Sequence, residues 1–491
     1  MSLGIFGLVA FGLLPLLASC APVNDDRKAE IASTIARADE PLIRGRAPLV
    51  AGKYARMAES PFDFYRGTVP LSLHDFRANN FGFGASRFAL TGPLVPALGD
   101  PHPENFGTLI AADGTLALEP NDLDGVDFGP YLWDVRRLAA GVALAARVSN
   151  PDDLAAQKLT AASSRSIAKA AAEGYAEAIA ALAAGGPRTR VDAANGDVIL
   201  DDLFQRSEKD LADRSELTEL TRLTGQTRKL RRGVLDPAEP SAMYLDVPTK
   251  AYEALPESIH RYRETLISPP ALAYFTLLDA ARELASGVAS FPRVRVILLV
   301  RGPTDDPKDD VILELKELAD SGLSGFYPPG VYFNDNAERV RVASRLAWAR
   351  PDAEPLWGTT SWMGFACQIK RESDGQKTIR TSRMKAEQGT PAALLSLARR
   401  LGGVVARAHA APHANAEWPI PAIAQVIAKD PVGFANEQAD IADRYAAQVL
   451  VDWALFGAVL EELGPRLGIP VDSTDTPPPD LAALYANNAA R

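Results

Sequence analysis

The chain has 491 residues, more than one hydrophobic core usually serves, so its length predicts two lobes or two domains. Apolar residues make up 47% and charged residues 23%, which is typical of a globular rather than a disordered protein. The net charge of −10 argues against a nucleic-acid-binding protein, which normally carries a basic face. The two cysteines, Cys20 and Cys367, cannot build a disulfide framework or a four-ligand zinc site.

The first twenty residues predict export and attachment to a membrane. Residues 3–18 form an apolar run, broken only by Pro15, that is too short to span a bilayer comfortably as a helix. The run leads into Leu-Ala-Ser-Cys at residues 17–20, and small residues before a cleavage point suit a signal peptidase. Cys20 at the first mature position resembles the bacterial lipoprotein box, in which the thiol is joined to diacylglycerol.

The resemblance to a lipoprotein implies a lipid-anchored protein of the cell envelope, on the periplasmic side. Alanine rather than aspartate follows Cys20, which favours the outer membrane in a Gram-negative cell. Residues 1–7 contain no Lys or Arg, which departs from the usual signal. A wrongly placed start codon, or a buried N-terminal helix of a cytoplasmic protein, therefore stays open as an alternative.

Periodicity and turn residues predict the elements of the mature chain. A short strand is expected at residues 116–118, and helices are expected over 133–147, over 152–185 and through most of 203–284. Apolar runs of strand length predict a sheet, and helical spacing then returns near the C-terminus. These later strands and helices are expected at residues 294–300, 311–315 and 364–370 and at 391–463.

The predicted elements divide the chain into six parts. These are a signal peptide at 1–19, a polar tether rich in Pro and Arg at 20–47, a helix-rich part with the candidate catalytic motifs at 48–285, a sheet-containing part at 286–385, C-terminal helices at 386–470 and a disordered tail at 471–491.

Two neighbouring loops carry the polar residues that predict chemistry. The first contains Asp100 and, five positions later, Asn105, and the second contains Asp122 and Asp124. Phosphoryl transfer to a hydroxyl needs a carboxylate that accepts the hydroxyl proton, and hard oxygen ligands for the metal ions that bridge the phosphates. Both loops can supply these groups to one pocket. Aspartate beside glycine and proline is also common in turns, so a purely structural role of Asp100 and Asp122 stays open.

Several motifs together resemble known kinases. Asp-Pro-His-Pro-Glu-Asn at residues 100–105 resembles the catalytic loop of protein kinases, and Asn-Asp-Leu-Asp at 121–124 is similar to the acidic motif of aminoglycoside and choline kinases. With residues 60–67 and 129–138, these segments are identified as those of the bacterial family called domain of unknown function 2252. The resemblance covers about residues 48–460. It implies an α+β, protein-kinase-like two-lobed fold, with a helix-rich catalytic lobe and a smaller antiparallel-sheet lobe.

The resemblance implies a role for each polar residue of the two loops. Asp100 would be the catalytic base, Asn105 and Asp122 would bind magnesium, and Asp124 would be an auxiliary ligand. His102 stands where many protein kinases have a lysine that meets the transferred phosphate. A neutral histidine would instead hydrogen-bond a phosphate or the substrate.

A kinase also needs a strand lysine that holds the α- and β-phosphates, a glutamate that orients it and a glycine-containing lid. We expect Lys316, Glu338 and Gly287 in these roles. All three follow the catalytic loop in the sequence, so the two lobes would be permuted. Lys316 as a plain surface lysine is an equal alternative, and Lys53 and Lys370 are further candidates.

These residues predict a Mg-dependent phosphotransferase that uses ATP or another nucleotide and acts on a small hydroxylated substrate. Two other functions fit the same residues. A catalytically inactive kinase-like lipoprotein would bind a ligand or partner, and the single glycine of the lid favours this alternative. A metal-dependent hydrolase would use the same carboxylates on a phosphoester. The expected partners are the membrane and a small molecule, without nucleic acid.

Overall fold

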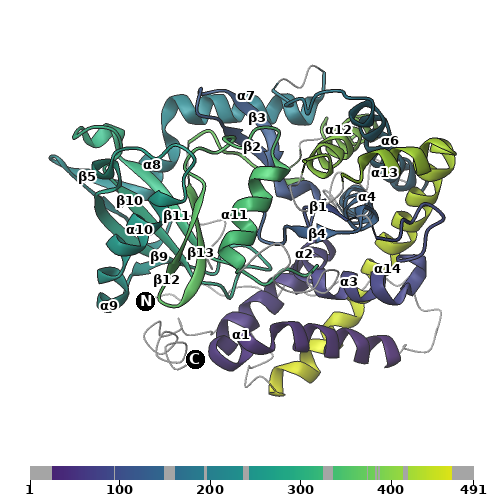
Figure 1. The fold of residues 1–491 in the computed structure, drawn as a ribbon. Helices are drawn as coiled ribbons and strands as arrows, with labels where there is room; N and C mark the ends of the chain where they lie inside the picture. The colour runs from purple at the N-terminus through teal and green to yellow at the C-terminus, as the bar shows by residue number, and fades with distance from the viewer. Residues whose placement is uncertain are drawn as a thin grey trace.

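The computed structural model describes residues 25–466 except 93, 149–160, 193–195, 236–242, 324–334, 373, 382–383, 385–386 and 413–417. The predicted signal peptide, Cys20 and the predicted tail therefore lie outside the described residues. The protein is an α+β protein, as predicted, with an antiparallel sheet on one side and packed helices on the other (Figure 1). No helix in the described ranges is both long and apolar enough to cross a membrane.

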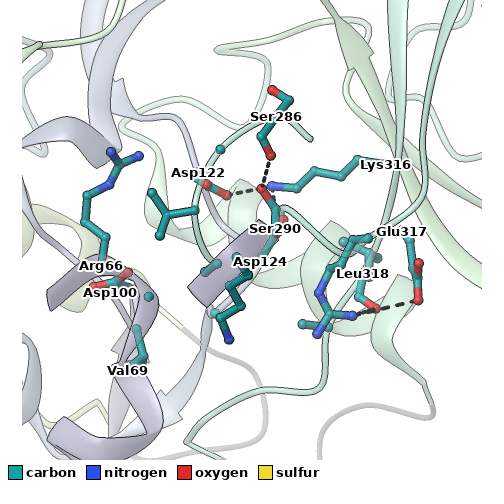
Figure 2. A pocket seen from close by; sticks show the side chains of 18 of the residues that line it. Arg66, Val69, Asp100, Asp122, Asp124, Ser286, Ser290, Lys316, Glu317 and Leu318 are labelled. Atoms are coloured by element: carbon teal, nitrogen blue, oxygen red, sulfur yellow. Dashed lines mark hydrogen bonds and ion pairs between the residues drawn. The ribbon is translucent and has the colours of Figure 1, made fainter. Parts of the chain in front are cut away.

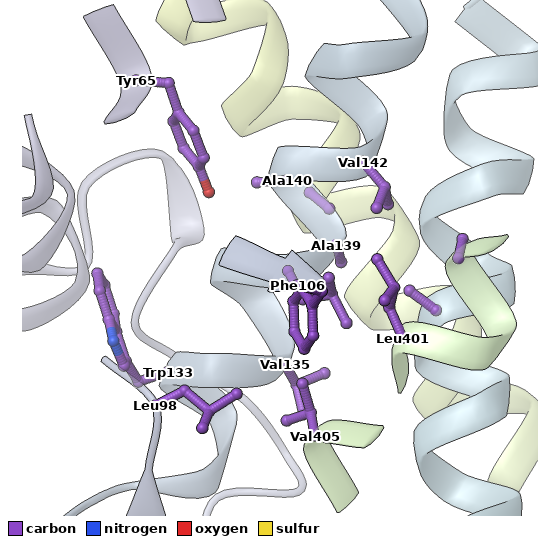
Figure 3. Packing of buried hydrophobic residues seen from close by; sticks show 14 of the residues in the cluster. Tyr65, Leu98, Phe106, Trp133, Val135, Ala139, Ala140, Val142, Leu401 and Val405 are labelled. Atoms are coloured by element: carbon purple, nitrogen blue, oxygen red, sulfur yellow. The ribbon is translucent and has the colours of Figure 1, made fainter. Parts of the chain in front are cut away.

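The helical part surrounds one central helix. α4 (Tyr131–Val148) is buried on all sides from Tyr131 to Ala146, because α6 (Ala161–Ala183), α12 (Pro391–His409) and α14 (Pro431–Arg466) pack around it. A helix buried on every side is usually apolar all round, and the Ala-rich sequence of α4 is apolar except for its charged residues, which are hydrogen-bonded. Figure 3 shows Phe106 beside Val135 of α4 and Leu401 and Val405 of α12. The helices predicted over 133–147 and 391–463 are confirmed.

Short elements connect the helices to the sheet. They are α2 (Pro61–Gly67), α3 (Val69–Ala78), η1 (Asn80–Gly82), β1 (Val95–Ala97), η2 (Pro103–Asn105), β2 (Phe106–Ile110), β3 (Leu116–Pro120), β4 (Asp127–Gly129), α7 (Val198–Asp213), α8 (Ser215–Leu220), β5 (Thr221–Thr224), β6 (Thr227–Leu230), α11 (Asn336–Ala347) and α13 (Ile420–Ala428). β2 and β3 form a hairpin, and β1 pairs with β4. The strand predicted at residues 116–118 is confirmed as part of β3.

Within the described residues, seven strands form one antiparallel sheet in the order β12-β13-β11-β10-β9-β8-β7. Their bounds are β7 (Gly233–Val234), β8 (Met243–Asp246), β9 (Leu277–Leu284), β10 (Arg295–Val300), β11 (Val311–Glu317), β12 (Gly358–Trp362) and β13 (Phe365–Arg371). Successive side chains of β10 face opposite sides. Val296 and Leu298 pack towards α10 (Leu255–Glu264), whereas Ile297 and Leu299 pack towards α8 and β6. The predicted strands at 294–300, 311–315 and 364–370 are confirmed.

The prediction of helix through most of 203–284 is confirmed for α7, α8, α9 (Thr249–Glu253) and α10 but is wrong where β5 to β9 form. Residues 277–284 are rich in Leu, Ala, Arg and Glu, which favour helix. They form β9 instead, because hydrogen bonding to β8 on one side and β10 on the other outweighs this weak preference. The sheet thus begins at β7, and the predicted boundary between the helix-rich and sheet-containing parts at residue 285 is wrong.

The prediction of a tether over residues 20–47 is also wrong from Asp25 onwards. α1 (Asp25–Glu59) is helical, with a kink at Arg46 two residues before Pro48. Its first turn is fixed by Arg27, whose buried guanidinium pairs with Asp75 at 2.8 Å and with Asp452 of α14 at 2.6 Å. This long-range pairing gives a polar segment a defined place against α14, which a composition rich in Pro and Arg does not indicate.

Candidate functional site

A cavity of about 810 Å³ lies between the helical part and the sheet. Its walls come from α1, α2, the two predicted loops, β11 and the connection between β9 and β10. Five predicted site residues on the two loops line it, and so do two from the sheet-containing part. They are Asp100, His102, Asn105, Asp122 and Asp124 from the loops and Gly287 and Lys316 from the sheet, together with Gly99, which precedes Asp100.

The two loops are held together by a close backbone approach. Gly99 has a φ of +83°, and a Cβ atom at this position would lie 2.1 Å from the carbonyl oxygen of Gly125. Glycine at position 99 therefore allows the loop that carries Asp100 to lie directly against the loop that carries Asp122 and Asp124. This contact brings the three carboxylates to one cavity.

The first turn of α4 fixes the loop before Asp100. The carboxylate of Asp134 accepts hydrogen bonds from the backbone nitrogens of Leu98 at 2.6 Å and Gly99 at 3.1 Å. Trp133 Nε1 donates to the carbonyl oxygen of Gly99 at 2.7 Å. Behind them, His409 Nε2 lies 2.9 Å from Asp134 Oδ2. His409 is fully buried and does not line the cavity, so it supports the loop through Asp134.

Asp100 projects into the cavity and is held by a buried arginine. Arg137 Nε donates to Asp100 Oδ1 at 2.7 Å, and His102 Nε2 lies 3.6 Å from Asp100 Oδ2. Burial raises the pKa of the Asp100 carboxyl, and Arg137 opposes the shift. Arg137 itself is saturated, because its other nitrogens donate to Ser72 Oγ and to the carbonyl oxygen of Tyr65. Asp100 is thus an oriented carboxylate with one oxygen turned away from the arginine.

His102 is buried beneath the cavity wall. The side chain is 2% exposed, and its ring packs edge-on against Phe62 with 5.8 Å between the ring centroids. Burial, with Arg66 and Arg137 nearby, lowers the pKa of the imidazole well below its ordinary value. Nδ1 has no hydrogen-bond partner among the residues that the structure describes. His102 is therefore neutral and supplies no positive charge to the cavity.

Asn105 closes its own loop. Its Nδ2 donates to the carbonyl oxygen of Asp100 at 2.8 Å, so the amide oxygen is the atom that remains for a ligand. The second loop is attached here, because the backbone nitrogen of Asn121 donates to the carbonyl oxygen of Asn105 at 3.1 Å. Asn121 Nδ2 donates in turn to Thr378 Oγ1 at 2.9 Å.

Lys316 reaches from β11 to both carboxylates of the second loop. Its Nζ lies 2.6 Å from Asp124 Oδ2 and 3.3 Å from Asp122 Oδ1 (Figure 2). Burial alone would lower the pKa of Lys316, but Asp122 and Asp124 outweigh it, so the pKa is raised and the lysine is charged. The pKa of Asp124 is raised by burial and by Asp122, whereas basic neighbours lower that of Asp122 despite its burial.

The predicted pair between Lys316 and Glu338 does not form. Lys316 is engaged with Asp122 and Asp124, and Glu338 is outside the described lining of the cavity. Glu338 lies instead in the first turn of α11, where its backbone nitrogen is capped by Asp335. The sequence was sufficient to predict that Lys316 lies on a strand. It did not indicate that the carboxylates of Asp122 and Asp124 would face this strand.

A second charged network on the sheet was missed by sequence reasoning. The carboxylate of Glu314 lies 2.8 Å from Arg295 Nε and 3.5 Å from Lys370 Nζ. Arg295 Nη1 also donates to Ser286 Oγ at 2.7 Å, which ties down the connection that contains Gly287. Because Arg295, Glu314 and Lys370 come from three neighbouring strands, only the register of the sheet shows that they meet. Lys370 therefore forms an ion pair with Glu314.

Lys53, the other candidate for the phosphate-binding lysine, is also paired with an acidic residue. Its Nζ lies 2.8 and 2.7 Å from the two carboxylate oxygens of Asp39 on α1. Both residues line the cavity at the end formed by α1. Lys316 is thus the lysine that contacts the acidic loop.

Hard oxygen ligands for a metal are present at the acidic loop. No group of three or more His, Cys, Asp or Glu side chains in the described ranges is placed to hold a metal ion by itself. Mg²⁺ is usually bound through one or two carboxylates together with substrate phosphates and water, so Asp122, Asp124 and the amide oxygen of Asn105 fit this ion. One oxygen of Asp124 is buried without a hydrogen-bond partner in the described structure, which also fits a cation ligand.

Comparison with known proteins identifies a family. Searches of curated proteins and of solved structures found no match to this chain. A family described as "Uncharacterized protein conserved in bacteria (DUF2252)" matches residues 46–459, close to the range predicted from the motifs. The chain therefore belongs to the DUF2252 family.

Proposed function

We propose that this protein is a Mg-dependent phosphotransferase with a protein-kinase-like, two-lobed fold whose lobes are permuted. It would transfer a phosphoryl group from ATP or another nucleoside triphosphate to a small hydroxylated substrate. One observation carries the proposal: Lys316 from the sheet contacts Asp122 and Asp124 in the same cavity as Asp100.

The order of elements in the sheet supports the kinase-like fold. In protein kinases a glycine-containing loop covers the phosphates and the phosphate-binding lysine lies on the third strand. Here β9, β10 and β11 are neighbours, the connection between β9 and β10 lines the cavity with Gly287, and Lys316 lies on β11. These strands follow Asp100 in the sequence, as a permuted order of lobes requires.

The contacts in the cavity support the following chemical roles. Asp100 accepts the proton of the acceptor hydroxyl, and Arg137 fixes the direction in which its carboxylate points. Lys316 binds the phosphates of the nucleotide. Asn105, Asp122 and Asp124 would hold magnesium, which neutralises phosphate charge when bound.

Binding of a magnesium nucleotide tests this function directly. The purified full chain is expected to melt at a higher temperature with Mg·ATP than with ATP and EDTA, because a ligand of the folded state stabilises it. Lys316→Met is expected to weaken Mg·ATP binding at least about tenfold, since a charge-assisted contact to phosphate is lost. Lys229→Met, in an exposed strand lysine whose Nζ donates to the carbonyl oxygen of Leu278, is the control and should bind like the wild type.

Other results of the same screen separate the alternatives. If no nucleotide stabilises the protein with magnesium, it is not a phosphotransferase, and a kinase-like binding protein becomes the better account. That alternative is favoured by the single glycine in the connection before β10. Magnesium-dependent release of phosphate from a phosphoester without any nucleotide would instead indicate the hydrolase.

We also propose that Cys20 carries a lipid that anchors the protein to the cell envelope. The lipoprotein-like sequence at residues 17–20 supports this, and the first described helix begins at Asp25. Cells fed a radiolabelled or clickable fatty acid are expected to label the wild type and Cys367→Ala, because Cys367 is buried in the sheet. Cys20→Ser should lose the label, and a labelled Cys20→Ser protein would rule out the anchor.

A further inference from the structure

The proposed reaction lacks an assigned cation for the phosphoryl group in transit. That group carries negative charge on its three outer oxygens while it passes from donor to acceptor, and a nearby cation stabilises this state. Lys316 is on the nucleotide side and is bound to Asp122 and Asp124. His102, at the loop position where kinases often have a lysine, is buried and packed against Phe62. The charge must come from another element.

Arg66 lines the cavity near Asp100 and can supply this positive charge. It is in the last turn of α2 and lines the cavity with its side chain beside Asp100 (Figure 2). Arg66 is close enough to Asp100 and His102 for its positive charge to lower the pKa of both side chains. Figure 2 places Arg66 on the side of Asp122 opposite Lys316. A group between Asp100 and Asp122 would therefore lie between two cations.

The position of Arg66 is fixed by a buried glutamate. Arg66 Nη1 lies 3.0 Å from Glu104 Oε2 and 3.3 Å from Asp63 Oδ1. Glu104 belongs to the catalytic-loop motif, and its other oxygen accepts from the nitrogen and hydroxyl of Thr381 at 2.8 and 2.7 Å. The glutamate thus connects the loop to the arginine and holds it without covering it.

Arg66 keeps hydrogen-bonding capacity for a ligand. Within the described structure both of its acidic contacts use Nη1, and Nε and Nη2 make no hydrogen bond and are not buried. Two free nitrogens of one guanidinium match the spacing of two phosphoryl oxygens. Arg137, the other arginine near Asp100, is fully buried and uses all its nitrogens, so it cannot take this role.

We propose that Arg66 is a catalytic residue that binds the outer oxygens of the transferred phosphoryl group. This inference rests on the proposed function. In the step, the acceptor oxygen forms a bond to the γ-phosphorus while its proton passes to Asp100. The bond between that phosphorus and the β,γ-bridging oxygen breaks, and the nucleoside diphosphate leaves with the electron pair. Arg66 contacts the phosphoryl group throughout and takes no proton.

A transition-state analogue tests this role without knowledge of the acceptor. Aluminium fluoride added to Mg·ADP imitates the transferred phosphoryl group. In the wild type it is expected to lower the Kd of Mg·ADP at least about tenfold. Arg66→Gln should reduce this gain to less than about twofold while leaving the Kd of Mg·ADP alone within about threefold, because Arg66 does not bind the diphosphate. Arg66→Lys, which can keep the pair with Glu104, should retain part of the gain.

The control and the contrary outcomes separate this inference from the proposed function. Arg56→Gln removes another arginine that lines the cavity and should keep the full gain. If Arg66→Gln also keeps it, or if His102→Gln loses it instead, the role of Arg66 is wrong and the phosphotransferase stands. If the wild type does not bind Mg·ADP, the proposed function fails and the role of Arg66 with it. Should Arg66→Gln not fold, Arg66→Lys decides: an undiminished gain with a lysine that cannot make two parallel hydrogen bonds contradicts the proposal.

Discussion

Asp100→Asn is expected to lower phosphoryl transfer about a thousandfold, within the range that a general base contributes. The amide has nearly the shape of the carboxylate and can still accept from Arg137, so the loop should keep its place. It cannot accept the proton of the acceptor hydroxyl. The release of ADP from Mg·ATP, with the acceptor that the wild type phosphorylates, measures the loss. Mg·ATP binding should stay within about threefold, because Asp100 acts only in the transfer step.

The pH profile gives this prediction a second readout. Asp100 accepts a proton only when ionised, and burial raises its pKa above the ordinary value for aspartate. Wild-type turnover should therefore fall as the pH falls through that raised pKa, and Asp100→Asn should lack this acidic limb. Asp113→Asn makes the same chemical change in the exposed turn between β2 and β3 and should have no effect on turnover. Full turnover in Asp100→Asn would falsify the assignment of the base.

The part of the site that the sequence predicted is local. Asp100 and Asn105 are five residues apart on one loop, and the β2–β3 hairpin returns the chain directly to Asp122. Short connections of this kind fix the relative position of side chains with few alternatives. For the same reason, strands with a continuous apolar run, such as β10, were predicted correctly.

The part that could not be predicted depends on contacts between distant segments. Lys316 is 194 positions from Asp122, and no pattern within either segment specifies that partner rather than Glu338. Arg66 and Arg137 lie in helices whose local sequences resemble ordinary packed segments, and their roles appear only when α2 and α4 meet the loop. Arg27 likewise makes the supposed tether helical through partners 48 and 425 positions away.

Gly99→Ala is expected to be the most damaging small substitution in the site. Alanine at a φ of +83° costs about 1–2 kcal/mol in backbone conformation alone. Its Cβ would also overlap the carbonyl oxygen of Gly125 at 2.1 Å, and relieving such overpacking typically costs a further 1–3 kcal/mol or so. Since the overlap is with backbone, the loops must move apart. Asp100 would then separate from Asp122, and Mg·ATP binding should weaken more than about tenfold.

Gly114→Ala isolates the effect of that contact. Gly114 has a nearly identical φ of +79°, but a Cβ there would meet no atom within 4 Å. The two variants therefore share the conformational cost, and only Gly99→Ala pushes the loops apart. Gly114→Ala should lower the melting temperature slightly and bind Mg·ATP like the wild type. Equal losses of stability and of binding in the two variants would mean that the contact between Gly99 and Gly125 does not position the site, and the acidic groups would then owe their convergence to α4 and β11 instead.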